Sequence, residues 1–336
     1  MSSMPATASV PDRVPECSLI VPVFRNEANI PQLLERFQQL QGFAAGGVEI
    51  ICVIDGSPDR CYELLNHGLS HAHYPARLLL LSRNFGSFAA IRVGLKAASG
   101  RYYAVMAADL QEPAELIIES FAALKRDECD VVLGTRNARD DPWLARIASS
   151  LFWRLYRAFI QRELPTGGVD IFACNRIFRD QLLTFQESHT SLVGQLIWLG
   201  FRRKYIPYAR QRRQHGESAW GFRRKWQYFL DSVYSFSDLP IKIFVGLGAI
   251  GVAASVAMGL IVLVARLMGE IVVPGYAATV IAIVFFSGLN LFGLGIIGSY
   301  VWRAYENTKS RPLAVVMREQ QFAPGQSSTT ESKSEL

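Results

Sequence analysis

Asp109 and Gln111 are the first residues whose types and spacing suggest chemistry, because they follow an apolar run two positions apart. Both side chains offer oxygen to a hard cation such as Mg²⁺, whose coordination shell phosphate oxygens then complete. A diphosphate leaving group needs such a cation, or Arg and Lys, to neutralise its developing charge. The spacing therefore predicts a metal site at Asp109 and Gln111. Plain helix initiation at Pro113 remains the alternative for Glu112.

A second apolar run ends in Asp55-Gly56-Ser57-Pro58-Asp59. A carboxylate at Asp55 can accept hydrogen bonds from a ribose or a base, and Gly56 lets the backbone turn close to a ligand. A simple turn capped by the aspartate is the alternative. The first apolar run continues into Phe24-Arg25-Asn26-Glu27 and not into G-x-G-x-x-G, which argues against a dinucleotide-binding domain.

Arginine recurs on one face of a helix predicted over 143–162, at Arg146, Arg154 and Arg157, with Ser150 among them. Paired guanidinium donors can grip a phosphate. A solvated basic face is the alternative, which we prefer for Arg154 and Arg157. A phosphate acceptor is already an anion near neutral pH, since its second pKa is about 6. It needs no general base, which agrees with a sequence that has no obvious catalytic histidine.

These residues fall at the ends of elements that alternate along the chain. Apolar runs predict strands over Cys17–Phe24, Val48–Asp55, Ala76–Ser82, Tyr102–Asp109 and Cys129–Arg136. Helical patterns lie between them, over Asn29–Leu40, Asp59–Ser70, Phe88–Ala98 and Pro113–Arg126. This alternation predicts an α/β domain with a mainly parallel sheet flanked by helices. Such sheets bind ligands at the carboxyl ends of their strands.

Half of the 336 residues are hydrophobic, and the excess lies between Ile241 and Trp302. Ile243–Ala265 and Ala277–Trp302 carry no charge, and each exceeds the roughly 20 residues that a bilayer core requires. We therefore predict two transmembrane helices. Their glycines offer small faces for close helix packing, within the chain or between copies in a homo-oligomer.

Positive charge flanks these spans, at Lys242 and Arg303, whereas the link Leu267–Tyr276 contains no Lys or Arg. The positive-inside rule predicts a multi-pass protein of the inner (plasma) membrane with both termini and the α/β domain in the cytoplasm. The chain has a net charge of +6, and the stretch Arg202–Lys225 contains nine basic residues and one acid, Glu217. The spans that follow favour anionic lipid headgroups over nucleic acid as the partner of this basic stretch.

Six motifs along residues 17 to 240 resemble glycosyltransferase family 2, in its polyprenyl-phosphate branch of dolichol-phosphate mannose synthase-like enzymes with a two-helix anchor. They are I-V-P-V-F-R-N-E from Ile20, D-G-S-P-D from Asp55, L-S-R-N-F-G from Leu81, A-D-L-Q-E-P from Ala108, G-T-R from Gly134 and R-Q-H-G-E-S from Arg213. The resemblance implies a GT-A fold, a UDP- or GDP-sugar donor, Mg²⁺ or Mn²⁺, and inverting transfer to a polyprenyl phosphate at the cytosolic membrane face. The product would serve cell-envelope glycan modification.

The resemblance also implies roles for single residues. On the donor side, the nucleoside is expected to contact Pro22, Glu27 and Asp55, and the nucleotide sugar to contact Ala108 and Asp109. The metal ion is expected at Asp109 and Gln111. The donor diphosphate is expected near Arg213 and Ser218. On the acceptor side, Arg136, Arg146 and Ser150 are expected at the lipid phosphate and, with Asp109, in the catalytic set.

Two positions depart from the family pattern. Ala107 and Ile54 stand where the family usually has the first Asp of D-x-D and of D-D-G-S. Asp109 is thereby left as the only certain acidic metal ligand. The departures motivate one alternative, a non-catalytic membrane adaptor. The other alternative is a processive polysaccharide synthase, although two spans cannot enclose a pore within one chain.

The chain is thus expected to divide into five parts. These are a flexible start at 1–16, a GT-A domain at 17–220, an amphipathic interfacial helix at 221–239, two transmembrane helices within 240–304 and a largely disordered cytosolic tail at 305–336.

Overall fold

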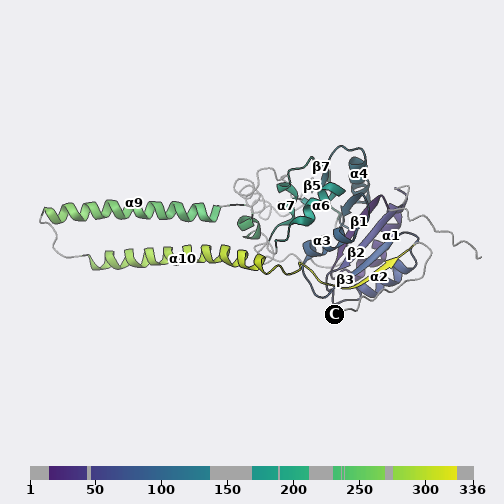
Figure 1. The fold of residues 1–336 in the computed structure, drawn as a ribbon, viewed down its shortest axis with the longest axis horizontal. Coiled ribbons are helices and arrows are strands. Elements are labelled where there is room, and N and C mark those ends of the chain that lie inside the picture. The colour runs from purple at the N-terminus through teal and green to yellow at the C-terminus, as the bar shows by residue number, and fades with distance from the viewer. Residues whose placement is uncertain are drawn as a thin grey trace, which may run out of the picture.

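The computed structural model describes residues 15–43, 47–136, 169–187, 190–211, 230–235, 237, 239–268 and 275–323. Within these residues an α/β domain carries two long helices that extend from it side by side (Figure 1). The predicted helix over 143–162 lies outside the described residues, as does the expected interfacial helix apart from 230–235, 237 and 239.

Eight strands of the described chain form one sheet, in the order β7-β5-β6-β4-β1-β2-β3-β8. The strands are β1 Cys17–Val23, β2 Val48–Ile54, β3 Ala76–Leu81, β4 Tyr102–Val105, β5 Val131–Arg136, β6 Val169–Asn175, β7 Arg203–Tyr208 and β8 Val316–Phe322. Only β6 and β8 run against the others, because each pairs antiparallel with its neighbours. The expected α/β class and mainly parallel sheet are therefore confirmed.

Helices cover both faces of the sheet. They are α1 Ile30–Gln41, α2 Cys61–Ser70, α3 Ser87–Ala97, α4 Ala114–Lys125, α6 Arg176–Thr184 and α7 Leu192–Trp198, with a short 3₁₀ helix η1 Glu27–Asn29. One core lies under α1, α2 and α4 and includes Leu33, Leu65 and Leu116. The other lies under α3, α6 and α7 and includes Ala90 and Phe178. The five predicted strands and four predicted helices of the N-terminal half all form, but β4 ends at Val105, short of the predicted Asp109.

Two arginines hold α3 and α6 against each other by capping their last carbonyls. Arg92 of α3 donates to the carbonyl oxygens of Leu182 at 3.0 Å and Leu183 at 3.2 Å, at the end of α6. Arg179 of α6 donates to the carbonyl oxygen of Leu95 at 3.0 Å, at the end of α3. Each cation thus lies at the negative end of the partner helix, which stabilises both.

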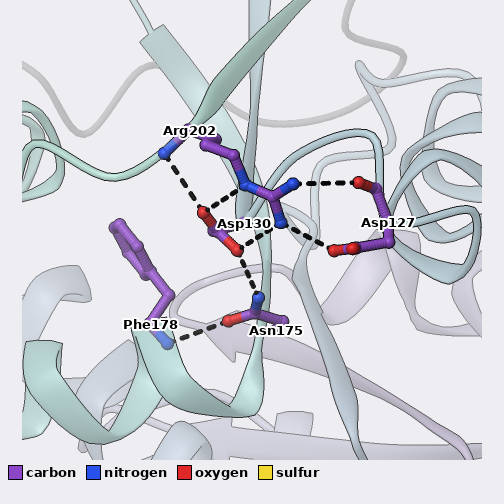
Figure 2. Close-up of polar contacts among 5 residues, drawn as sticks. All are labelled: Asp127, Asp130, Asn175, Phe178 and Arg202. Carbon is purple, nitrogen blue, oxygen red and sulfur yellow. Dashed lines mark hydrogen bonds and ion pairs between the residues drawn. The ribbon is translucent and has the colours of Figure 1, made fainter.

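A cluster of charges clamps the amino ends of β5 and β7 (Figure 2). Arg202 donates to the Asp130 carboxylate at 3.0 Å and to Asp127 at 2.6 Å. Asp130 also accepts from Asn175 at 2.9 Å, and Asn175 caps α6 by accepting from the Phe178 N–H. Lys204 pairs with Glu128. Arg202 and Lys204 thus both pair with nearby carboxylates, and the contact of the basic stretch with lipid headgroups stays a prediction.

The helices α9, Leu239–Leu267, and α10, Tyr276–Thr308, contain the two predicted spans. Both are long and apolar enough to cross a membrane. They contact through small residues: the ring of Phe244 fills the space that a side chain at Gly293 would occupy, and Phe286 lies 3.0 Å from a Cβ position at Gly251. Residues 230–235 are helical and pack beside α10, where Arg303 pairs with Asp231 at 2.8 Å. Val233 of the expected interfacial stripe is buried in the protein.

The chain beyond 305 corrects the predicted disordered tail. Helix α10 continues to Thr308, and Val316–Phe322 forms β8 at the edge of the sheet, antiparallel to β3. The side chain of Phe322 is buried in the domain core. The α/β domain therefore includes a segment that follows both long helices; residues 324–336 lie outside the described part.

Candidate active site

The candidate residues gather at one edge of the sheet because β1 to β5 and β7 point in one direction. Their carboxyl ends therefore share that edge, and the segments that leave β1, β2, β3 and β4 are neighbours. Arg136 is the last residue of β5 and faces Tyr208 in β7. The sequence-predicted residues Pro22, Glu27, Asp55, Ala108, Asp109, Gln111 and Arg136 all lie at or just beyond these strand ends.

The segments after β1 and β2 are linked by hydrogen bonds. The backbone N–H of Arg25, at φ 53°, donates to Ser57 Oγ at 2.7 Å. Ser57 in turn donates to Asp59 at 2.6 Å. The carboxylate of Glu27 accepts from the backbone and side chain of Arg60 at 3.1 and 2.9 Å. The backbone bond from Arg60, followed by its side-chain bond, lowers the pKa of Glu27. Two of the sequence motifs are thus joined at this edge of the sheet.

Asp55 organises the segment that follows β3. Its buried carboxylate accepts from the backbone N–H groups of Phe85 at 2.7 Å and Gly86 at 2.9 Å. Gly56, at φ 56°, passes so close that a Cβ there would lie 2.3 Å from the carbonyl carbon of Arg83. Asp55 therefore shapes the loop 82–86, which we call the β3 loop, and its predicted contact with a nucleoside stays a prediction.

Asp109 and Gln111 lie in the turn after β4, where Leu110 takes a left-handed conformation at φ 55°. Ala108 is buried and Asp109 is partly exposed. The Gln111 side chain is buried, and its amide nitrogen donates to the carbonyl oxygen of Gln211 at 3.1 Å. Its amide oxygen accepts from the guanidinium of Arg210.

Arg210 is a site residue that the sequence reasoning missed. It follows β7 by two residues, and its contact with Gln111 joins the end of β7 to the end of β4. The sequence did not indicate a strand before Arg210, because β7 contains Pro207 and shows no apolar run. Proline is tolerated in β7 because this strand lies at an edge of the sheet. With Arg25, Arg83 and Arg136, it adds a guanidinium to an edge that also holds the carboxylates of Glu27, Asp55 and Asp109.

The metal site predicted at Asp109 and Gln111 stays a prediction. The Asp109 carboxylate suits a hard divalent cation. Gln111 would have to release Arg210 before its oxygen could turn to a cation. Among the described residues, no group of three or more His, Cys, Asp or Glu side chains is placed to hold a metal ion. In the described turn after β4, Asp109 offers one partly exposed carboxylate, and substrate phosphate oxygens would supply further ligands. The predicted residues Arg146, Ser150, Arg213 and Ser218 lie outside the described part.

Comparison with known proteins identifies the family of this chain. The sequence profile described as Glycosyl transferase family 2 matches residues 18–184. An uncharacterized glycosyltransferase of Synechocystis is 31% identical over 90% of this chain and 94% of its own. A bactoprenol glucosyl transferase of Shigella phage SfV is 29% identical over 90% of this chain and 99% of its own.

Among solved structures, a mannosyltransferase from Pyrobaculum calidifontis, in complex with GDP-Man and Mn²⁺, superposes with a TM-score of 0.50. It is 15% identical and covers 88% of this chain and 86% of its own, a likeness in fold. The sequence match to relatives spans the α/β domain and the long helices alike. On this evidence the chain belongs to glycosyl transferase family 2 and is a glycosyltransferase.

Proposed function

We propose that this glycosyltransferase moves a sugar from a nucleotide-diphosphate sugar to a polyprenyl phosphate at the cytosolic face of a bilayer, with inversion at the anomeric carbon. The observation that carries the proposal is a sheet edge where Asp109 and several arginines follow the strand ends, in a chain that also has two membrane-length apolar helices. Relatives named as bactoprenol glucosyl transferases align over nearly their whole length, which supports a lipid phosphate as acceptor.

The exposed apolar side chains of α9 and α10 support insertion in a bilayer. Ile250, Leu260, Phe285 and Leu291 are each more than half exposed. In water such a surface would be costly, whereas lipid chains cover it without loss. The basic residues that flank the helices support a cytoplasmic position for the α/β domain. A homo-oligomer through these helices remains a prediction.

The proposed transfer requires that the enzyme position the donor and the acceptor and neutralise the charge of the diphosphate leaving group. An oxygen of the lipid phosphate attacks the anomeric carbon while the bond to the nucleoside diphosphate breaks, so no proton has to be removed from the acceptor. Arg136, with Arg146 and Ser150 by family likeness, would hold the acceptor phosphate through charge-assisted hydrogen bonds. Arg213 and Ser218 would lie near the donor diphosphate. Asp109 would hold a divalent cation, which when bound neutralises charge on the diphosphate.

The test is a donor screen on purified full-length protein in lipid nanodiscs. Undecaprenyl phosphate, Mg²⁺ or Mn²⁺ and a panel of UDP- and GDP-sugars are supplied, and products are identified by mass spectrometry. We expect a lipid carrying one sugar with at least one donor. A polymeric product would favour a processive synthase. No transfer and no donor binding by calorimetry would favour an adaptor and overturn the proposal.

A further inference from the structure

The final strand, β8, connects the second long helix to the candidate donor site. Seven residues, Lys309 to Val315, separate the end of α10 from the start of β8. Because an extended chain spans at most about 3.4 Å per residue, the start of β8 stays within roughly 27 Å of the end of α10. The domain is therefore attached to the paired helices at two places, before α9 and after α10.

β8 is fixed to the sheet by side chains as well as by its backbone. Phe322 is buried in the core at one end of the strand. In the middle, Arg77 of β3 lies between Glu319 at 3.5 Å and Glu49 of β2 at 3.4 Å. Glu49 also accepts from Ser18 of β1 at 2.6 Å. These contacts fix the register of β8 on β3.

The other end of β8 reaches the β3 loop. The backbone N–H of Ser82 donates to the carbonyl oxygen of Val315 at 3.0 Å. Three residues later, the N–H groups of Phe85 and Gly86 donate to Asp55. The loop is thus held at its start by the chain that returns from α10, and at its end by the residue that follows β2.

We infer that β8 is a positioning element for the donor site: by fixing the start of the β3 loop, it keeps Arg83 and Asn84 at the carboxyl edge of the sheet. This inference rests on the proposed function, because it places the nucleotide sugar beside that loop. The membrane anchor then does more than attach the enzyme, since the segment that leaves α10 orders part of its substrate site.

Two truncated proteins test the inference, both retaining α9 and α10. One ends at Leu313 and lacks β8; its matched control ends at Ala323 and keeps it. For the chain that ends at Leu313 we expect the KM for the sugar nucleotide to rise about fivefold, the weight of one backbone hydrogen bond. The KM for undecaprenyl phosphate and the kcat should change little, and the control should match the full chain.

Hydrogen exchange gives a readout that does not depend on activity. Amides of the β3 loop should exchange faster in the chain that ends at Leu313, while those of β1 and β4 keep their protection. Unchanged exchange at residues 82–86 together with an unchanged donor KM would overturn the inference. A full-length enzyme that transfers no sugar would overturn the proposed function, and the exchange experiment would still test the coupling.

Truncation could also loosen the whole sheet, which loss of protection in β1 and β4 would reveal. In that case Phe322→Ala in the full chain is decisive, because it weakens the docking of β8 from the end distant from the β3 loop. We expect faster exchange at residues 82–86 and a raised donor KM in this variant as well. Values equal to those of the full-length wild type would overturn the inference.

Discussion

At the scale of single residues, the proposed metal site depends mainly on the carboxylate of Asp109. Ala107 occupies the position where the family pattern has another carboxylate, and the buried Gln111 is engaged with Arg210 and Gln211. The substitution of a carboxylate by alanine is compatible with activity if arginines share the neutralisation of the diphosphate. Arg210 is a described candidate for this role, since its guanidinium contacts Gln111, two residues beyond Asp109.

Asp109→Asn tests the assigned carboxylate with the least change in shape. We expect the kcat/KM for sugar transfer to fall by about 10²–10³, the usual effect of removing one preorganised charge contact at a reacting diphosphate. Glu115→Gln is the matched control, because Glu115 is an exposed carboxylate in the first turn of α4. Rates of both variants are compared at saturating Mn²⁺. Wild-type turnover by the asparagine variant would remove Asp109 from the site.

A substitution at Gly56 tests whether the segments after β2 and β3 must lie in close contact. Gly56→Ala places a Cβ 2.3 Å from the Arg83 carbonyl carbon at a positive φ, so the backbone must shift. We expect a loss of about 1–3 kcal/mol in stability, measured as a lower thermal midpoint in detergent, and a raised donor KM. Gly42→Ala is the control, because a Cβ there meets nothing within 4 Å. Equal midpoints for the two variants would contradict the argument.

At the scale of elements, the position of the site residues depends on the register of β5 and β7, which is fixed at the amino ends of these strands. The clamp of Arg202, Asp127 and Asp130 joins the starts of β5 and β7 (Figure 2). At the other ends of these strands, Arg136 is the last residue of β5 and Arg210 follows β7 by two residues. A shift of β7 against β5 would therefore separate Arg210 from Gln111.

Asp130 predicts a pH dependence of stability. Hydrogen bonds from the Arg202 side chain, chiefly, lower the pKa of Asp130 below its ordinary value. A depressed folded-state pKa stabilises the fold above the unfolded pKa of about 4, and this contribution is lost as the pH falls through the folded pKa. Asp130→Asn should therefore lower the thermal midpoint at pH 7, and its difference from the wild type should shrink below about pH 4.

The control for this titration is Asp127→Asn. The Asp127 side chain is 80% exposed, against 15% for Asp130, so solvent screens its bond to Arg202 and its replacement should cost less. Thermal midpoints of the three proteins are compared from pH 3 to pH 7. A difference between wild type and Asp130→Asn that stays constant over this range would contradict the assignment.

At the scale of the whole molecule, the pairing of β8 in the sheet limits how the two long helices can be arranged in a membrane. β8 follows both long helices, yet it lies in the same sheet as the strands that precede them (Figure 1). Two helices that cross a membrane between strands of one sheet must have both outer ends on the same side of it. We predict that this side is the cytoplasm, because Lys242 and Arg303 are basic residues at the helix ends.

Reporter fusions test this topology in bacterial cells. Alkaline phosphatase fused after Ala323 should be inactive, because the enzyme requires disulfides that form outside the cytoplasm. A green fluorescent protein at the same position should fluoresce. Phosphatase inserted into the link at 269–274 should be active. Active phosphatase after Ala323 would show that β8 cannot be in the cytoplasm.

The sequence by itself determined the elements whose signal is local. The strands and helices from Cys17 to Arg136 follow from runs and periods of apolar residues, and the two long helices follow from uncharged stretches. The motif residues at the ends of β1, β2, β4 and β5 were placed at one edge because parallel strands share their carboxyl ends.

Only the tertiary structure decided which distant residues meet there. β8 pairs with β3 although its sequence, Val316-Met317-Arg318-Glu319-Gln320-Gln321-Phe322, has no apolar alternation, because an edge strand is mostly exposed and is held by backbone bonds. Arg202 meets Asp130, and Arg210 meets Gln111, through pairings of strands remote in the chain. Periodicity reports burial along one segment and carries no record of its partner, so these contacts become visible only when the sheet is assembled.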